Sequence, residues 1–412
     1  MKTCNELTAE KKEQVKRIDF EKASVNLRDV IIRTSLIHSR NFSDEYQNEV
    51  YLKPENLQKT GAFKIRGAYN KISKLTEDER KRGLIASSAG NHAQGVAYAA
   101  NQLGVSATIV MPKTTPLIKV EATKKLGAKV VLSGDCYDEA YQEALLLQEK
   151  NNYVFIHPFN DVDIIEGQGT IGLEIIEELP DVDCVLVPVG GGGLISGIAM
   201  AIKKNHPHVK IIGVEPKGAM AMKISLENNE ISHLEEVCTI ADGVAVKRPG
   251  DLTFPLVQEY VDEIVSVSDF EIMECFLVLL ERHKLIGENA GVLSLAGLKK
   301  IEERNKKIVC LISGGNIDVL TVSSMIDRGL ISRGRIFRFA VDLPDKPGEL
   351  VKISRILADC NANVIKLDHN QFKTIDRFLE VELDVTVETN GYKHIEEIKE
   401  EFIKHKYIIK EI

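Results

Sequence analysis

Short apolar strands alternate with helices along most of this chain, and this alternation restricts the fold more than any other feature. In the first half, we place apolar strands at residues 84–87, 107–111, 129–132 and 153–157. Helices lie between these strands, and local residues mark their ends. For the helix at 116–126, Pro116 lies in the first turn and Gly127 follows the last turn. Strands of about four to six residues alternating with helices of about a dozen predict parallel sheets covered on both faces.

The same pattern returns in the second half of the α/β region. We predict strands at residues 184–189, 211–214 and 308–312 and helices at residues 164–179, 194–204 and 269–283. These elements fit two α/β subdomains, with the smaller one, about residues 58–150, inserted in the larger. Ligands of open α/β sheets bind at the carboxyl ends of the strands, so we expect the site there.

A different pattern follows residue 334. We predict strands at 335–343 and 364–370, a third strand through Val381, Leu383, Val385 and Val387, and a closing strand at 407–412. Helices at 349–360 and around 395–403 complete the order βαββαβ, which predicts a ferredoxin-like domain over residues 335–412. We expect a linker at 327–334 and a catalytic domain at 1–326.

Composition excludes several classes of protein. The net charge of −8 disfavours a nucleic-acid surface. The stretch 184–202 is uncharged, but it contains Pro188 and four consecutive glycines, which do not suit a membrane span. The cysteines are isolated, without disulfide or zinc spacing, and are Cys4, Cys136, Cys184, Cys238, Cys275, Cys310 and Cys360. We therefore expect a cytoplasmic protein without nucleic-acid or membrane partners.

Lys64 lies in a segment suited to chemistry. It stands between Phe63 and Ile65, and Gly61 and Gly67 allow the backbone to approach closely on either side. Burial would lower the pKa of its amine, and the nearby cation Arg66 could assist. Such lysines form Schiff bases with carbonyls, including the aldehyde of pyridoxal phosphate (PLP). The alternative is a solvated lysine at the start of a helix.

Residues 190–193 are four glycines between a buried strand and a helix. Backbone amides there can surround a phosphate, aided by the helix dipole. The spacing is not that of a dinucleotide fingerprint, because the glycine triples that begin at Gly190 and Gly191 end in Ile195 and Ser196. Glu215 nevertheless resembles a ribose-binding acid, so a nicotinamide-dependent oxidoreductase stays open as an alternative.

Two further polar segments follow apolar strands. Residues 87–95 contain Asn91, whose amide can donate to a phenolate oxygen, and helix-start amides that suit a carboxylate. An ordinary helix cap is the alternative there. Ser313 follows the strand at 308–312, where a simple turn is the alternative.

Together, over about residues 20–320, these motifs resemble the fold-type-II (tryptophan synthase β-like) PLP enzymes, specifically the threonine dehydratases. The resemblance implies that Lys64 holds PLP through a Schiff base and that Phe63 lies near its ring. It implies further cofactor contacts from Asn91 to the 3-hydroxyl, Gly243 to the ring and Ser313 to the pyridine nitrogen. The implied phosphate site is Gly190, Gly191, Gly192, Gly193 and Leu194.

The resemblance also implies the reaction. The substrate carboxylate would bind at Ser88, Ala89, Gly90, Asn91 and His92. β-Elimination would convert L-threonine to 2-oxobutanoate and ammonia, and L-serine to pyruvate. Serine dehydratases or racemases of the same fold, and a regulatory protein without catalysis, are alternatives.

The chain departs from the related sequences at three places. Glu288-Asn289-Ala290-Gly291 replaces a common Glu-Pro-Ser-Gly turn, so a role for Glu288 stays open. Serine racemases have a serine at the position of Ala89, where it returns a proton to the substrate, so we expect little racemisation. They also bind a divalent metal through a Glu and a later Asp. Here Glu215 is followed by Ala221, so we predict no such metal, and a monovalent cation stays open.

The C-terminal segment resembles an ACT module. Residues 345–350 match the first strand-to-helix loop of that module, and residues 361–364 match the start of its second strand. The resemblance implies an amino-acid effector, isoleucine or valine, at Gly348, Leu350 and Asn363. Because such modules pair, it also implies a homodimer or homotetramer. A packing or oligomerisation domain is the alternative.

Overall fold

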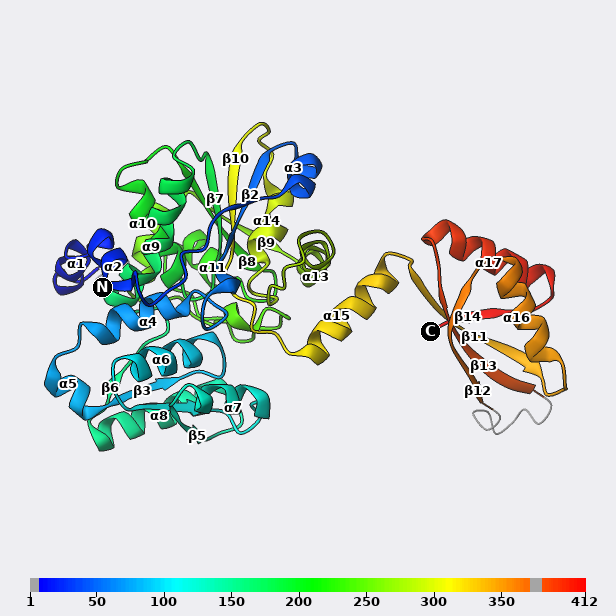
Figure 1. Cartoon of the computed structure of the whole chain (residues 1–412), viewed down its shortest axis with the longest axis horizontal. Helices are drawn as coiled ribbons and strands as arrows, with labels where there is room; N and C mark the ends of the chain where they lie inside the picture. Colours follow the sequence, from blue (N-terminus) through cyan, green and yellow to red (C-terminus); the bar gives the residue numbers. More distant parts are fainter. Residues whose placement is uncertain (1–6, 371–379) are drawn as a thin grey trace. The chain divides into compact units, whose positions relative to one another are not determined.

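The structure is a computed structural model that describes residues 7–370 and 380–412. The chain divides between Ile317 and Asp318 into two compact units (Figure 1). Helix α15 (Val319–Ser332) belongs to the second unit, and the predicted linker at 327–334 overlaps the end of this helix. No helix within the described residues has both the length and the apolar character needed to cross a membrane.

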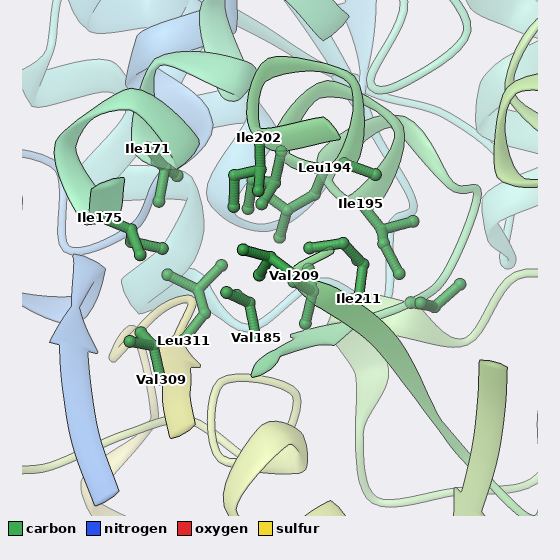
Figure 2. Packing of buried hydrophobic residues seen from close by; sticks show 14 of the residues in the cluster. Ile171, Ile175, Val185, Leu194, Ile195, Ile202, Val209, Ile211, Val309 and Leu311 are labelled. Carbon is green, nitrogen blue, oxygen red and sulfur yellow. The ribbon is translucent and has the colours of Figure 1, made fainter. Parts of the chain in front are cut away.

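The first unit is built around a six-stranded sheet. Its strand order is β1-β2-β10-β7-β8-β9, and every neighbouring pair is parallel except β1 and β2. The strands are β1 (Ile37–His38), β2 (Glu49–Pro54), β7 (Cys184–Pro188), β8 (Lys210–Pro216), β9 (Glu263–Val267) and β10 (Lys307–Ile312). Helices α9 (Val162–Glu178) and α10 (Gly193–Lys203) pack on this sheet (Figure 2). The buried cluster between them includes Ile171, Ile198, Val185, Ile211 and Leu311.

A second, four-stranded parallel sheet lies within the same unit, with the order β5-β4-β3-β6. Its strands are β3 (Leu84–Ser87), β4 (Ala107–Met111), β5 (Lys129–Leu132) and β6 (Val154–Phe155). Helices α4 (Lys64–Ser73) and α6 (Asn91–Gln102) enclose its core through Ala68, Ile72, Val96 and Ala100. The two α/β sheets confirm the predicted fold class of the first unit.

The other helices of the first unit surround these sheets. They are α1 (Ala9–Lys16), α2 (Phe20–Leu27), α3 (Arg40–Tyr46), α5 (Glu77–Arg82), α7 (Leu117–Lys125), α8 (Tyr137–Asn151), α11 (Ala221–Glu227), α12 (Thr253–Tyr260), α13 (Asp269–Val278) and α14 (Leu293–Gly297). Short turns are η1 (Glu55–Leu57), η2 (Asp242–Val244), η4 (Leu298–Lys300) and the π-helical η3 (Leu279–His283). The single helix predicted at 269–283 is thus α13 followed by a wider π turn.

The second unit has the element order β11 (Ile336–Pro344), α16 (Glu349–Asp359), β12 (Asn363–Asn370), β13 (Glu380–Glu388), α17 (Tyr392–Lys404) and β14 (Ile409–Glu411). The sheet order is β12-β13-β11-β14, and all pairs are antiparallel. Alternate residues of β13, from Val381 to Val387, are buried against the two helices. This βαββαβ arrangement confirms the predicted ferredoxin-like fold.

Strand β2 was not predicted, because a charged residue interrupts its apolar pattern. Lys53 lies in the strand and is fully buried. Its amine lies 2.7 Å from the Glu174 carboxylate and also donates to the Thr34 carbonyl. A buried ion pair of this kind leaves no signal in local hydrophobicity.

Arg66 lies at the centre of the same buried network. Its guanidinium donates two bonds of 2.8 Å to Glu55 and bonds of 2.6 and 3.0 Å to Glu174. Arg66 and Glu55 have no exposed surface. Glu55 therefore depends on Arg66 for compensation of its charge, whereas Glu174 is compensated by both Arg66 and Lys53.

We predict that Arg66→Met lowers the free energy of unfolding by about 3–5 kcal/mol, because the buried Glu55 loses its guanidinium partner and Glu174 loses one of its two cations. Urea-induced unfolding measures the change. Arg33→Met is the matched control, because the Arg33–Glu177 pair is more than half exposed and should contribute at most about 1 kcal/mol. Equal losses in the two variants would contradict the proposed dependence on Arg66.

Candidate active site

Lys64 is the first residue of α4 and is partly buried. Nζ donates a 2.7 Å hydrogen bond to the Pro158 carbonyl and lies 5.1 Å from the centre of the Phe63 ring. Burial lowers the pKa of the Lys64 amine to about 8, although the negative charge of Glu288 acts in the opposite direction. About a tenth of this amine is therefore a neutral nucleophile at pH 7, compared with well under a thousandth of an ordinary lysine.

Arg66 does not contribute to this low pKa as we expected. Its charge is compensated by Glu55 and Glu174, and burial is what lowers the pKa of Lys64. The expectation was wrong because residues two apart on a helix point in different directions. Arg66 instead fixes the start of α4 to the larger subdomain.

The segment before Lys64 pairs with the segment after β10. The Phe63 amide donates to the Ser313 carbonyl at 3.1 Å, and the Gly315 amide donates to the Gly61 carbonyl at 2.8 Å. Ala62 and Gly314 form a β-bridge between these two contacts. The structure thus brings the buried Ser313 next to the Lys64 segment.

Asn91 begins α6, and both ends of its side-chain amide have partners. Its Nδ2 donates to Glu288 Oε1 at 2.5 Å, and its Oδ1 accepts from Asn316 Nδ2 at 2.8 Å. Burial raises the pKa of Glu288 to about 7, with Asn91 acting to lower it. A Cβ on Gly314 would lie 2.7 Å from Glu288 Oε1, so glycine is required between these groups.

From the sequence, the role of Glu288 stayed open and Asn316 was not included in the site. Asn91 and Glu288 are 197 residues apart, and no local spacing connects them. The Ser-Gly-Gly-Asn order at 313–316 was the available signal for Asn316, but we used only its serine.

The glycine loop between β7 and α10 has no room for side chains. A Cβ on Gly191 would lie 2.5 Å from the Phe159 ring, and one on Gly193 would lie 2.7 Å from the Phe159 carbonyl oxygen. Gly190 would meet Val244 at 3.0 Å, and Gly192 has a φ of +93°. The first amides of α10, including that of Leu194, have no partner within the helix. This side-chain-free loop at a helix start fits the phosphate of PLP.

Gly243 lies beside the Glu288 loop. A Cβ on Gly243 would lie 2.9 Å from Ala290 Cβ and 3.4 Å from Glu288 Oε1. Its backbone therefore reaches the same group of residues as Asn91, as the resemblance implied for a ring contact.

The predicted carboxylate loop, Ser88 to His92, connects β3 to α6. The Gly90 amide donates to Ser88 Oγ at 3.2 Å, and Ala89 packs against the core of the smaller sheet. The His92 ring is buried, with Nε2 2.8 Å from the Ile156 carbonyl, and burial lowers its pKa to about 3. The His92 imidazole is therefore neutral, and its Nε2 is already hydrogen-bonded to the Ile156 carbonyl. A carboxylate here would be bound by backbone amides and the Ser88 hydroxyl.

Glu215 has a local role. Its carboxylate accepts 2.9 Å hydrogen bonds from the amides of Met222 and Lys223 at the start of α11, and burial raises its pKa to about 7. Glu215 had suggested a ribose-binding acid of a nicotinamide enzyme, and its carboxylate is here hydrogen-bonded to these two amides. In the part of the chain that the structure describes, no three His, Cys, Asp or Glu side chains are grouped to hold a metal.

The predicted effector residues all lie in the second unit. Gly348 caps α16 with a φ of +98°, Leu350 is 43% exposed in the first turn of α16, and Asn363 begins β12. No two of them share a hydrogen bond among the contacts of the described residues.

Fold and site together define a fold-type-II PLP enzyme. Residues 27–314 match the family described as pyridoxal-phosphate dependent enzyme. The chain belongs to this family and uses PLP.

Similar proteins narrow this class. The chain is 49% identical to an L-threonine ammonia-lyase of Thermotoga maritima, over 95% of this chain and 98% of that protein. It is 46% identical to an L-threonine ammonia-lyase of Geobacter sulfurreducens, over 92% and 95% of the two chains. The structure of processed threonine deaminase isoform 2 from Solanum lycopersicum matches with a TM-score of 0.73 and 40% identity, covering 79% of this chain and 90% of that one. The resemblance to threonine dehydratases is confirmed.

We predict that the Lys64 amine of the cofactor-free protein reacts as a base with a pKa near 8. Its neutral fraction should rise as the pH increases through this value, well below the value of about 10.4 for a free lysine. Trace acetylation at pH 6–11, followed by peptide mass spectrometry, measures the profile, with exposed lysines of the same sample as reference. A Lys64 profile with a midpoint above about 10 would contradict the burial effect.

Proposed function

We propose that this protein is a threonine ammonia-lyase that converts L-threonine to 2-oxobutanoate and ammonia, and L-serine to pyruvate. The single observation that carries the proposal is the Lys64 amine, whose pKa is lowered to about 8 in a segment that pairs with the Ser313 segment. Threonine ammonia-lyases that match almost the whole chain support the choice of substrate.

The residues present can hold PLP in one orientation. Lys64 would bind its aldehyde carbon, the amides of residues 190–194 its phosphate, and Ser313 its pyridine nitrogen. Asn91 would donate to its 3-hydroxyl, with Gly243 against the ring. When bound, PLP supplies an electron sink for charge at the substrate α-carbon. Ser313 is a neutral partner that does not force protonation of the pyridine nitrogen, which favours elimination over reprotonation.

Lys64 then acts as the base. Once the substrate amine has displaced it from PLP, the free Lys64 amine would take the α-proton of the substrate, and the resulting ammonium would donate a proton to the β-hydroxyl, which leaves as water. The product, 2-aminobut-2-enoate, tautomerises to an imine, and water converts the imine to 2-oxobutanoate and ammonia. The Ser88 hydroxyl and the helix-start amides of residues 90–92 hold the substrate carboxylate during these steps.

The face opposite Lys64 has no acid at position 89. Ala89 carries no exchangeable proton, so a returning proton has no donor on that side. A racemase of the same fold is therefore the weaker interpretation.

The Pro158 carbonyl that accepts a hydrogen bond from Lys64 belongs to the chain itself, so the base is held in place before substrate binds.

We predict that Lys64→Ala abolishes both the absorbance of the lysine–PLP Schiff base near the visible edge and keto-acid release from L-threonine and L-serine. The absorbance spectrum and a keto-acid assay measure these losses. For the unsubstituted enzyme, chiral chromatography of the remaining amino acid should show little D-isomer. Lys59→Ala is the control, because this exposed lysine lies just before the site and donates a 3.4 Å hydrogen bond to the Asp29 carbonyl. Retention of both signals in Lys64→Ala would contradict the proposed function.

We further propose that the second unit is an ACT-type sensor that binds isoleucine, with valine opposing it, in a cytoplasmic homodimer or homotetramer. Its ferredoxin-like order supports this proposal, as does a glycine-capped loop with an exposed Asn363 at the start of the next strand. A coupling of roughly 1–3 kcal/mol between effector and substrate would suffice for control. Such control suits an enzyme that supplies isoleucine synthesis.

We predict that Asn363→Ala retains basal activity and loses the response to isoleucine, because Asn363 would hydrogen-bond the polar groups of the effector. Threonine saturation curves with and without millimolar isoleucine or valine measure the response. Lys393→Ala, at a side chain that is 94% exposed on α17, is the control. If the unsubstituted enzyme shows no shift in threonine dependence or melting temperature with any aliphatic amino acid, the unit is structural.

A further inference from the structure

The turn between β6 and α9 is held by one imidazole. His157 Nδ1 accepts hydrogen bonds from the amides of Phe159 at 3.2 Å and Asn160 at 2.8 Å. An imidazole nitrogen that accepts two amide protons carries none itself. The remaining proton of the neutral ring is therefore on Nε2. The acceptor at Nδ1 closes residues 157–160 into a defined turn, as the side chains of Asn and Asp do elsewhere.

The first consequence of this turn concerns Lys64. Pro158 lies inside the closed turn, and its carbonyl accepts the 2.7 Å hydrogen bond from the Lys64 amine. The direction of this carbonyl is set by the bonds that His157 accepts from the next two amides. His157 thus acts on Lys64 through the backbone and has no direct contact with it in the described structure.

The second consequence concerns the glycine loop. Phe159 is the next residue of the turn. Its ring packs so closely against Gly191, and its backbone so closely against Gly193, that neither glycine has room for a Cβ. Phe159 therefore packs against two of the four glycines of the loop, Gly191 and Gly193. Displacement of Phe159 would leave a gap under the amides that face the phosphate.

The last residue of the turn completes this support. Asn160 Oδ1 accepts the Leu252 amide at 2.9 Å, which fixes the start of α12. Thr253, the next residue, donates its hydroxyl to the Gly191 carbonyl at 2.5 Å. The glycine loop is thus held on one side by Phe159 and on the other by α12, and both contacts originate in the same turn.

We propose that His157 is a positioning residue that aligns the Lys64 amine and the glycine loop for PLP by accepting the amides of Phe159 and Asn160. The inference rests on the proposed function for the identity of the ligand. Burial lowers the pKa of His157 to about 4, despite Asp161 acting to raise it, so the ring remains a neutral acceptor near neutral pH. No other described side chain accepts these two amides.

The test is the affinity of the cofactor-free full-length enzyme for PLP and for pyridoxal, which lacks the phosphate. His157→Leu removes the acceptor and should raise the Kd for PLP about tenfold or more, because two backbone hydrogen bonds are lost. The advantage of PLP over pyridoxal should shrink, because the phosphate loop loses support. His157→Asn restores an acceptor that can reach the same two amides and should return the Kd to within about threefold of the unsubstituted enzyme.

Controls separate this role from general stability. His208→Leu, at an exposed histidine in the connection before β8, should change neither affinity. If His157→Leu does not fold, His157→Ala removes the acceptor without adding bulk. An unchanged Kd for PLP in a folded His157→Leu or His157→Ala, or an Asn variant as weak as the Leu variant, would overturn the proposal. Failure of the unsubstituted enzyme to bind PLP would instead overturn the proposed function, and this inference with it.

Discussion

The chemistry of this protein depends on one partly buried lysine amine that is hydrogen-bonded to a neutral carbonyl. Burial lowers the pKa of Lys64 to about 8, and the Pro158 carbonyl fixes its direction without supplying a charge that would restore the proton. A carboxylate in the place of that carbonyl would favour the ammonium form. The buried Glu288 acts in that direction, but burial raises its own pKa to about 7, which limits its negative charge near neutral pH.

Backbone contacts bring the parts of the site together around this amine. The pairing of residues 61–63 with 313–315 joins the start of α4 to the end of β10. The turn at 157–160 joins the Lys64 amine to the glycine loop. The Arg66 network fixes α4 to the larger subdomain from the other side. Parts that come from both sheets are thus held without a large number of side-chain contacts.

Sequence reasoning located candidate residues where a local segment leads into a helix. Lys64, Asn91 and the four glycines lie in such segments, and their residue types follow from what a helix start can bind. Arg66 and Glu288 show the limit, because their roles depend on partners distant in sequence, Glu174 and Asn91. The same limit explains the unpredicted β2, whose buried Lys53 is stable only beside a carboxylate from α9.

The most direct test of the central claim is the location of the covalent bond to PLP. Borohydride reduction of the enzyme loaded with PLP, followed by protease digestion and mass spectrometry, identifies the modified lysine. We expect the phosphopyridoxyl mass on the peptide that contains Lys64 in close to one copy per chain. A phosphopyridoxyl group mainly on another lysine, or none after loading with excess PLP, would contradict the claim that the buried Lys64 amine organises the site.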